Sequence, residues 1–594
     1  MFHPLCAPAA SFPLPSWRKL LSATLCALAL AAPAQARDAA LHQIFDADWA
    51  WRLRQDPLLA TETGERRYNH LLPDVSPRAR QADLAHKRRV LQALQRFDPA
   101  RLDEQDALSL QLLRRQYQID LDKAALTPHK IYALTALDGG HYDLLSMIDK
   151  MPFENRRDYL NYLARLRAVP QYLRQLQAHL DAAEKSGWRP PRVILSKAPQ
   201  QLRLLAQTLA HSQFSAPLQN LGHTKADQAL RQRFQRALQS DVKPALLAFA
   251  AWLQNDYLPR CRETVGAGDL PQGAAYYQLA IRENTTTDMT AEQVHALGLQ
   301  EVARIQQEMQ SVMRETGFNG DFNAFAKKLN TEPQFFHQTP EALLQGHREM
   351  VARTRQALPA LFGKLPHTPP DVKAAPGPNA EQAAGAWYEA GSPDGKRPGR
   401  FYANTSALHT RPKWKMETLT LHEAEPGHHF QVMLAQDNQN LPAFRRFGWL
   451  VAYGEGWALY AESLGPQLGW FKDPYARFGH LDDALYRAAR LVVDTGLHAK
   501  GWSRQQAIDY LNQNTANPPA DNEVEVDRYI GWPGQALGYK IGQLKILQMR
   551  QQAETALGAR FDIRAFHDYL LASGPLPLDI LEQRMRNWQQ TAAQ

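Results

Sequence analysis

The chain has 594 residues, of which 44% are hydrophobic and 22% charged, with 68 Lys and Arg against 60 Asp and Glu. This composition is typical of a globular protein and excludes a disordered, collagen-like or membrane-embedded chain. A net charge of +8 is mild for this length, and no long basic run accompanies it, so we expect no nucleic-acid partner.

The first 36 residues have the pattern of a secretory signal peptide. Arg18 and Lys19 precede an apolar stretch from Leu20 to Leu30, and a small-x-small cleavage pattern ends at Ala36. The apolar stretch is short for a membrane span, so we expect cleavage after Ala36 and no integral membrane segment in the mature chain. A buried N-terminal helix is the weaker alternative. We therefore expect an exported protein, periplasmic or secreted.

The cysteines limit the kinds of site that the mature chain can build. Cys6 and Cys26 fall in the predicted signal peptide, which leaves Cys261 as a single thiol that cannot form an internal disulfide. Leu25, directly before Cys26, also disfavours a lipoprotein anchor. A metal site must therefore rest on histidine and carboxylate ligands.

Helical periodicity dominates the mature chain. From Arg156 to Ser186 leucines recur at helical spacing on both sides of Pro170, and Gly187 ends the pattern. Similar patterns predict helices over residues 80–120, 197–256, 291–316, 340–362, 478–500 and 503–513. Residues 192–195 and 275–281 are the best strand candidates. We predict a mainly α fold with two helical lobes and a small edge β-sheet.

Residues 365–400 are rich in proline and glycine and divide the sequence. They separate an N-terminal helical part, residues 37–364, from a C-terminal helical part, residues 401–594, that holds nearly all the chemical signals. Two lobes can enclose one buried site, so we expect a single composite catalytic unit over residues 40–594. The oligomeric state is left open.

The segment from His422 to His428 carries the clearest chemical motif. His422-Glu423 on an apolar helix resembles the start of the zincin signature His-Glu-x-x-His, but Pro426 occupies the position of the second histidine. On a regular helix His428 would lie about 240° around the axis from His422, and His429 about 10 Å further along it.

Pro426 and Gly427 change that geometry. Pro426 lacks the N–H that would bond the carbonyl of His422, and Gly427 supplies backbone freedom. We predict a distortion that turns His428 back toward His422, with His429 as the reserve ligand. A plain helix end with solvated histidines is the alternative, and the clustering of histidines and carboxylates favours the metal.

A catalytic zinc site needs a third protein ligand and an open position. Glu455 lies between two glycines that allow a close helix approach, and we predict it as the third ligand of a single Zn²⁺. Glu462, two helical turns later, is the reserve ligand or an orienting partner. Taken alone, both could be surface glutamates.

The whole pattern resembles the bacterial family called domain of unknown function 885, over residues 43–590. The matching segments are Asp56-Pro57, Ala60-Thr61, Leu163–Leu166, Leu270–Gly273, Asn404-Thr405, His422–His429, Glu455–Trp457, Arg528-Tyr529 and Pro533–Ala536. That family is similar to all-helical gluzincin peptidases such as thimet oligopeptidase, carboxypeptidase Taq and angiotensin-converting enzyme. The resemblance implies a zinc peptidase with a deep channel between two helical lobes.

The mechanism expected of such a site assigns further residues. Glu423 would accept the proton of the attacking water. Tyr529 and Tyr539 are the candidates to stabilise the oxyanion, because the resemblance implies tyrosines in this late region. Arg528 is the candidate to bind substrate. Packing is nearly as good an explanation for each tyrosine.

Two other groups are weaker candidates. Asp494 and His498 lie at i and i+4 on one helix, where they could support the metal site and bind substrate or make structural hydrogen bonds. Arg400, Tyr402 and Asn404 alternate as on an extended strand, so Tyr402 and Asn404 could hold a substrate backbone at a sheet edge.

The sequence thus predicts a zinc-dependent metallopeptidase that hydrolyses short peptides. A zinc hydrolase of another amide or ester is the nearest alternative. A helical periplasmic binding or scaffold protein with a structural metal is the competing class.

Overall fold

The structure is a computed structural model that describes residues 37–127, 134–375 and 385–593. The predicted signal peptide, its cleavage position, Cys6 and Cys26 lie outside the described residues. Within them, no helix has the length and apolar character that a membrane crossing requires. The predicted mainly α fold with a small β-sheet is confirmed.

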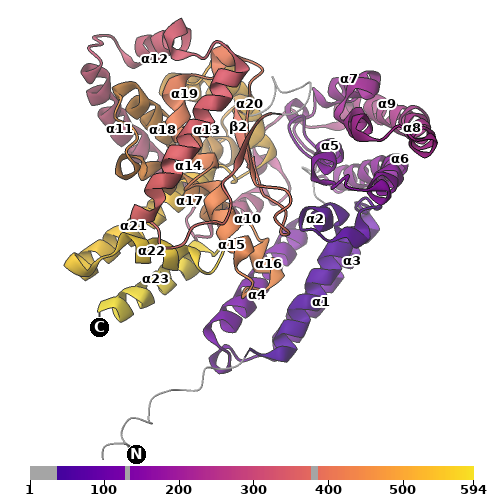
Figure 1. Ribbon diagram of the computed structural model, residues 1–594, viewed down its shortest axis with the longest axis horizontal. Helices are drawn as coiled ribbons and strands as arrows, with labels where there is room; N and C mark the ends of the chain where they lie inside the picture. Colours follow the sequence, from indigo (N-terminus) through magenta and orange to yellow (C-terminus); the bar gives the residue numbers. More distant parts are fainter. Residues whose placement is uncertain (1–36, 128–133, 376–384, 594) are drawn as a thin grey trace, which may run out of the picture.

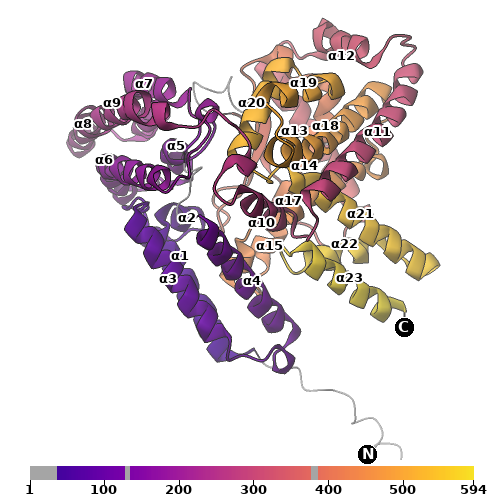
Figure 2. The same cartoon turned by 180° about the vertical axis from the view of Figure 1, so that it is seen from behind.

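The N-terminal half forms a helical lobe of its own (Figures 1 and 2). Its helices are α1 (Ala39–Gln55), α2 (Pro57–Glu62), α3 (Pro77–Leu94), α4 (Glu104–Leu126), α5 (Gly140–Lys150), α6 (Arg156–Lys185), α7 (Ala198–Thr208), α8 (Lys225–Ala237) and α9 (Lys243–Trp252). Both views place these helices on one side and the C-terminal helices on the other.

The second lobe begins before the proline- and glycine-rich segment. It contains α10 (Gly273–Thr285), α11 (Ala291–Glu315), α12 (Phe322–Thr331) and α13 (Pro340–Ala357). After the sheet follow α14 (Met416–Glu423), α15 (His428–Asp437), α16 (Ala443–Arg446), α17 (Val451–Ser463), α18 (Pro474–Ala499), α19 (Arg504–Asn514), α20 (Pro519–Gly531), α21 (Leu537–Leu557), α22 (Ile563–Leu571) and α23 (Leu578–Ala593).

A three-stranded sheet occupies the segment that the sequence marks as a connection. Its strands are β1 (Asp371–Ala374), β2 (Ala386–Glu389) and β3 (Arg400–Ala403), in the order β1-β3-β2. β3 pairs parallel with β1 and antiparallel with β2, so Tyr402 lies opposite both Lys373 and Trp387. The expectation that Arg400, Tyr402 and Asn404 form an edge strand is therefore wrong. β3 is central because β1 and β2, both preceding it, add on either side.

Most predicted helices are present, with different boundaries. α6 runs through Pro170 and is capped by Asn155, and α19 begins with the expected capping box of Ser503 and Gln506. Residues 80–120 divide into α3 and α4. The two strand predictions fail: residues 275–281 lie inside α10, and residues 192–194 form a single 3₁₀ turn.

The failed strand has a simple physical explanation. The buried residues of this segment include Tyr276, Tyr277, Ala280 and Ile281. They lie at i, i+1, i+4 and i+5, which places them on one face of a helix. Two adjacent tyrosines raise the local β propensity, but burial against neighbouring helices decides the conformation.

The two larger apolar cores combine the two lobes. One joins α6 and α9 to α11, α18 and α20. The other joins α1 and α4 to α17, α21 and α23. A third, smaller cluster lies between α13 and the sheet, within the second lobe. Each lobe therefore buries part of its apolar surface against the other.

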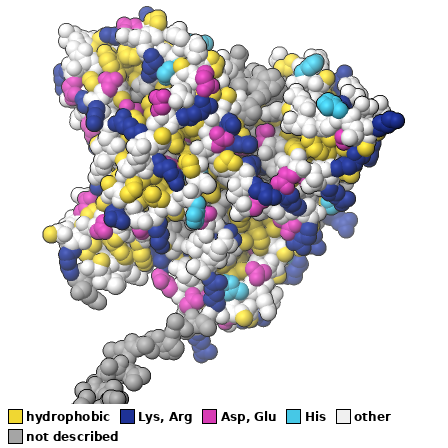
Figure 3. Space-filling model, viewed as in Figure 1, with side chains coloured by type: hydrophobic (Ala, Val, Ile, Leu, Met, Phe, Trp, Pro, Cys, Tyr) yellow, Lys and Arg dark blue, Asp and Glu magenta, His cyan; other side chains and the backbone are white. Residues whose placement is uncertain are grey.

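Charged side chains are dispersed over the face shown in Figure 3. Lys and Arg are interspersed there with Asp, Glu and apolar side chains rather than gathered in one large area. The excess of basic residues is therefore spread thinly over this face.

Two glycines allow α17 and α21 to cross in close contact. A Cβ atom at Gly456 would lie 2.5 Å from the Cα of Gly542, and one at Gly542 would lie 2.0 Å from the carbonyl oxygen of Ala452. The predicted close approach beside Glu455 is confirmed. This crossing sets the position of Glu455 relative to α21.

Replacing Gly456 tests the importance of this crossing. We expect Gly456→Ala to lower the free energy of unfolding by about 1–3 kcal/mol, because the added methyl group forces the helices apart. Gly385→Ala is the control, since its Cβ would meet no atom closer than 3.8 Å. Equal denaturation midpoints for both variants and the wild type would contradict this explanation.

Candidate metal centre and cavity

The helix that carries His422 breaks before His428. α14 ends at Glu423, a turn covers residues 424–427, and α15 begins at His428. A Cβ atom at Gly427 would lie 1.9 Å from the carbonyl oxygen of His422, so only glycine fits this turn. The predicted distortion at Pro426-Gly427 is confirmed.

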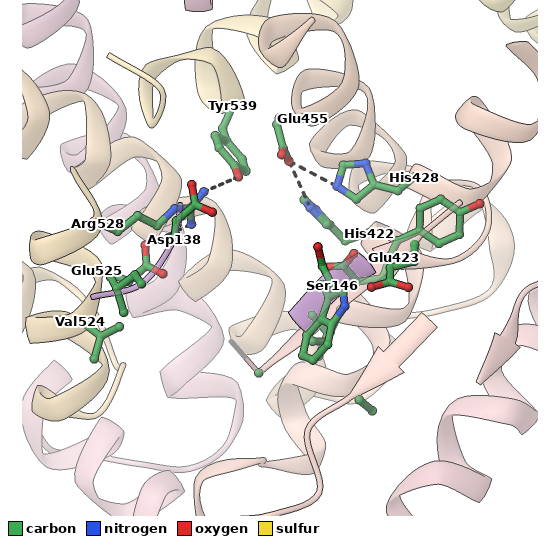
Figure 4. A pocket seen from close by; sticks show the side chains of 18 of the residues that line it. Asp138, Ser146, His422, Glu423, His428, Glu455, Val524, Glu525, Arg528 and Tyr539 are labelled. Atoms are coloured by element: carbon green, nitrogen blue, oxygen red, sulfur yellow. Dashed lines mark hydrogen bonds and ion pairs between the residues drawn. The ribbon is translucent and has the colours of Figure 1, made fainter. Parts of the chain in front are cut away.

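The break brings three potential ligands together (Figure 4). The Nε2 atoms of His422 and His428 lie 3.6 Å and 3.3 Å from Oε2 of Glu455. Ligand atoms of these three residues all lie within 4.8 Å of one another. His422 comes from α14, His428 from the start of α15 and Glu455 from α17.

The chemistry of these atoms fits a divalent metal ion. All three residues are buried, and Oε2 of Glu455 has no hydrogen-bond partner among the described residues. Burial opposes the charge of Glu455, but the two histidines outweigh it and hold its pKa well below the usual value. Two imidazoles and one carboxylate beside an open cavity form a ligand set used by catalytic zinc.

Glu462 supports the cluster from behind. Its Oε1 lies 2.7 Å from Nδ1 of His422, the nitrogen that faces away from Glu455. Burial lowers the pKa of His422, but the carboxylates of Glu455 and Glu462 outweigh this effect and raise it to about 10. Donation from Nδ1 to Glu462 orients the ring and leaves Nε2 free for a metal. Glu462 thus lies in the orienting position rather than in the ligand cluster.

His429 faces a different part of the protein. Its Nε2 lies 2.7 Å from the carbonyl oxygen of Thr368, and its Nδ1 lies 3.2 Å from the hydroxyl of Tyr388. Burial lowers the pKa of His429 to about 4. Between the two histidines that the sequence left open, the structure brings His428 to the cluster and not His429.

The cluster opens onto a cavity of about 1110 Å³ between the two lobes. Glu423 also lines it, next to His422, as Figure 4 shows. The N-terminal half contributes part of the wall through α2, α5 and the residues between α4 and α5. The cavity therefore exists only where both halves meet.

The two candidate tyrosines differ in position. Tyr539 lines the cavity, and its hydroxyl accepts a hydrogen bond from Nη2 of Arg528 at 3.0 Å. Tyr529 is 1% exposed and lies behind the wall, where its hydroxyl contacts Arg490 and Tyr486. Tyr539 and Arg528 reach the cavity, whereas Tyr529 does not.

Residues 57–585 match the family described as "Bacterial protein of unknown function (DUF885)". The chain belongs to this family. No curated protein matches the chain.

Solved structures of similar proteins exist. A protein from Colwellia psychrerythraea, described as a "putative lipoprotein", has a TM-score of 0.88 at 28% identity and covers 93% of this chain and 99% of its own. A "putative lipoprotein of unknown function" from Shewanella oneidensis has a TM-score of 0.68 at 20% identity, covering 92% of this chain and 100% of its own. The second similarity shows the fold alone.

Asp494 and His498 make structural contacts in this DUF885 chain. Asp494 accepts hydrogen bonds from the hydroxyl of Tyr277 at 2.6 Å and from the backbone N–H of Gly534 at 3.1 Å. His498 lies 3.0 Å from the carbonyl oxygen of Tyr529 through Nε2. Neither side chain lines the cavity. The alternative of structural hydrogen bonds is the one observed, and substrate contact through His498 is wrong.

The strand that lines the cavity along its whole length is β2, the neighbour of the strand that we expected to hold the substrate. Tyr402 is buried at the centre of the sheet and accepts from Arg400, and the side chain of Asn404 is bonded to Ser406. Neither residue lines the cavity, so their predicted substrate contacts are wrong. All four residues of β2 do line it.

Four residues of α18 line the cavity without having been predicted: Asp483, Tyr486, Arg487 and Arg490. Their helical spacing places these side chains on one stripe of the helix. This spacing could have pointed to a polar cavity wall, but in the sequence it fits an ordinary solvated helix face equally well.

Metal analysis of single variants tests the ligand set. We expect His422→Ala and His428→Ala to lose stoichiometric zinc because each removes a ligand, whereas His429→Ala retains it. The measurement is zinc per chain after dialysis, with circular dichroism to verify folding. Retention of zinc by all three variants, or loss by His429→Ala alone, would contradict the assignment.

Asp494 gives a pH dependence of stability. Burial raises its pKa to about 7, although hydrogen bonds from Tyr277 and Gly534 favour the charged form. Because an unfolded aspartate titrates near pH 4, the folded state binds this proton more tightly, and the stability it contributes is lost as pH rises from about 4 to about 7.

Asp494→Asn mimics the neutral form and keeps an acceptor oxygen for both donors. We expect it to raise the thermal unfolding midpoint relative to the wild type, and to do so more at about pH 8 than at about pH 5. Asp509→Asn, an exposed position on α19, is the control. An equal effect at both pH values would contradict the raised pKa.

Proposed function

We propose that the protein is a zinc-dependent metallopeptidase that hydrolyses short peptides. One observation carries the proposal: two histidine nitrogens and a carboxylate oxygen converge at a cavity wall that Glu423 shares. A bound zinc ion supplies a Lewis acid for a carbonyl oxygen and lowers the pKa of a water molecule. The remaining steps fall to residues of the chain.

Glu423 is the proposed general base. It follows the ligand His422 directly, lines the cavity and remains 8% exposed. Its carboxylate takes the proton of the attacking water and returns it to the leaving nitrogen. Both transfers need a carboxylate close to the metal and open to the cavity, and the place of Glu423 beside His422 on the cavity wall supports this role.

Tyr539 is the proposed oxyanion donor. Its hydroxyl accepts from Arg528, so its own proton is free to donate to the carbonyl oxygen as negative charge develops there. Figure 4 shows Tyr539 on the wall next to Glu455. Tyr529, behind that wall, holds Arg490 instead and has no catalytic part in this proposal.

A peptide suits the cavity in size and form. About 1110 Å³ exceeds the volume of most small-molecule sites and accommodates several residues. β2 is an edge strand of the described sheet, paired with β3 alone, and its four residues line the cavity. An extended peptide can add to such an edge through backbone hydrogen bonds.

The alternatives differ in what they require of the site. A structural zinc ion takes four protein ligands as a rule, and three converge among the described residues. That observation favours catalysis over a scaffold with a structural metal. A hydrolase of another amide or ester would use the same ligands and base, and the substrate decides between it and a peptidase.

We also propose export of the protein, with removal of residues 1–36. The charged and apolar pattern of that segment supports the proposal. The description of two solved relatives as "putative lipoproteins" is consistent with it, since lipoproteins are exported proteins.

Peptide hydrolysis by the zinc-loaded protein tests the proposed function. We expect cleavage of a mixed peptide library, loss of cleavage with a chelator and its return with zinc. Glu423→Gln should slow hydrolysis by about 10²–10⁴-fold while retaining zinc, because it removes the base and not a ligand. Mass spectrometry of the products gives rates and cleavage positions.

Glu349→Gln, at an exposed position on α13, is the matched control. Full activity of Glu423→Gln, or no cleavage by zinc-loaded wild type, would overturn the peptidase proposal. Hydrolysis of esters or non-peptide amides in place of peptides would support the alternative hydrolase.

A further inference from the structure

A second group of charged side chains lines the cavity apart from the metal ligands. Arg487 and Arg490 come from α18, and Arg528 comes from α20. Figure 4 shows Arg528, with Glu525 beside it, on the side of the cavity opposite His422 and His428. Nothing in the proposed hydrolysis uses the two arginines of α18.

Arg490 is held rigidly at this wall. It is 3% exposed, and its guanidinium carbon lies 4.4 Å from the ring centres of both Tyr486 and Tyr539. Nε donates to Tyr529 and Nη2 to Tyr486, but Nη1 has no hydrogen-bond partner among the described residues. A buried guanidinium with an unpaired N–H group can donate a hydrogen bond to an acceptor atom of a ligand.

The three arginines form ion pairs with two carboxylates, those of Glu525 and Asp483. Glu525 is shared between Arg490 and Arg528, at 3.2 Å and 3.5 Å. Arg487 reaches Asp483 at 3.4 Å, and Lys415 shares that carboxylate at 3.5 Å. The other two carboxylates of α20 that line the cavity, Asp521 and Asp527, form no ion pair with these arginines among the described residues.

The state of Glu525 reflects the two arginines beside it. Burial opposes its charge, but Arg528 and Arg490 outweigh burial and lower its pKa to about 2. A second carboxylate placed at this wall would be stabilised by the same arginines. Nε of Arg487 is also buried without a hydrogen-bond partner in the described chain, so donors remain for it.

The wall from the N-terminal half has no arginine cluster. Among its described residues, those that line the cavity include Glu62, Asp138, Asp143 and Asp149 and no Lys or Arg. An anion in the cavity is repelled by these carboxylates and attracted to the guanidinium groups of Arg487, Arg490 and Arg528. The arginine cluster is thus the favourable position for the negative end of a peptide.

We infer that Arg487, Arg490 and Arg528 form a subsite for the C-terminal carboxylate of the peptide substrate. The inference rests on the proposed function, which it deepens by assigning cleavage near the C-terminus. Arginine suits a carboxylate because its planar fork donates two parallel hydrogen bonds. The chain terminus is the one carboxylate that every peptide carries.

Helix α18 allows the distance between the proposed subsite and the metal centre to be approximated. His480 on this helix lies 4.0 Å from Glu462, which contacts His422. Arg487 and Arg490 follow seven and ten residues later, about 10 and 15 Å along the axis. An extended peptide covers about 3.3–3.6 Å per residue, so products of about three to four C-terminal residues are expected.

Paired peptides with a free C-terminal acid or a C-terminal amide test the subsite. Binding to the zinc-loaded Glu423→Gln variant is measured by calorimetry, so that the test does not depend on turnover. We expect the amide to bind about tenfold more weakly or worse, because it loses charge-assisted hydrogen bonds. With wild-type enzyme, cleavage should keep a constant distance from the free acid terminus.

Variants of α18 assign the effect to the cluster. Arg487→Gln should reduce the preference for the acid, and Arg487→Lys should restore part of it by returning the charge. Arg477→Gln is the control, since Arg477 is on the same helix, pairs with Glu315 and does not line the cavity. The comparison of acid and amide peptides uses protein with its arginines intact, so it remains valid even if an arginine variant folds poorly.

Equal binding of acid and amide overturns the subsite, whether or not the enzyme cleaves peptides. A peptide amide ending in glutamate that binds as well as the free acid overturns the assignment to the chain terminus. Preferred binding of the acid without any hydrolysis by zinc-loaded wild type supports the subsite while the peptidase proposal fails. The two proposals are therefore separable.

Discussion

The buried carboxylate of Glu455 between two histidine nitrogens is the constraint around which the C-terminal lobe is arranged. A carboxylate taken out of water costs free energy unless a cation or hydrogen-bond donors compensate it. His422 and His428 approach it because the helix breaks at Pro426-Gly427. Glu462 braces His422 from the opposite side. Each of these contacts requires the others, so the cluster is a single unit.

Helix α18 relates this centre to the rest of the cavity. Near its start His480 approaches Glu462, its middle carries Arg487 and Arg490 on the cavity wall, and its end is held by the bonds of Asp494. α18 also packs in the core that joins the two halves. A single rigid helix thus fixes the separation between the metal ligands and the arginine cluster, whatever the substrate.

The cavity is a property of both lobes together. Neither of the two larger apolar cores is completed by one lobe alone, and the cavity wall likewise draws on both. Among the described residues, the metal ligands and all the arginines that line the cavity come from the second half, whereas the charged lining residues of the first half are carboxylates. A cavity of about 1110 Å³ between lobes suits an unfolded peptide better than a folded protein, which is consistent with the proposed substrate.

The sequence by itself determined the features that depend on local chemistry. Leucine periodicity predicted α6, capping residues predicted α19, and the imino acid at position 426 predicted the break between the histidines. Ligand types and the glycines beside Glu455 then pointed to the metal cluster, because only small residues permit that helix approach.

Tertiary structure decided what depends on partners distant in sequence. The choice of His428 over His429 follows from which ring meets Glu455, and the central place of β3 follows from the addition of β1 and β2 on either side of it. The arginine stripe of α18 is buried only because α20 and α21 pack beside it. Periodicity gives the face of a helix, but not the neighbour that covers it, and here the neighbour determines whether a charge is solvated or lines the cavity.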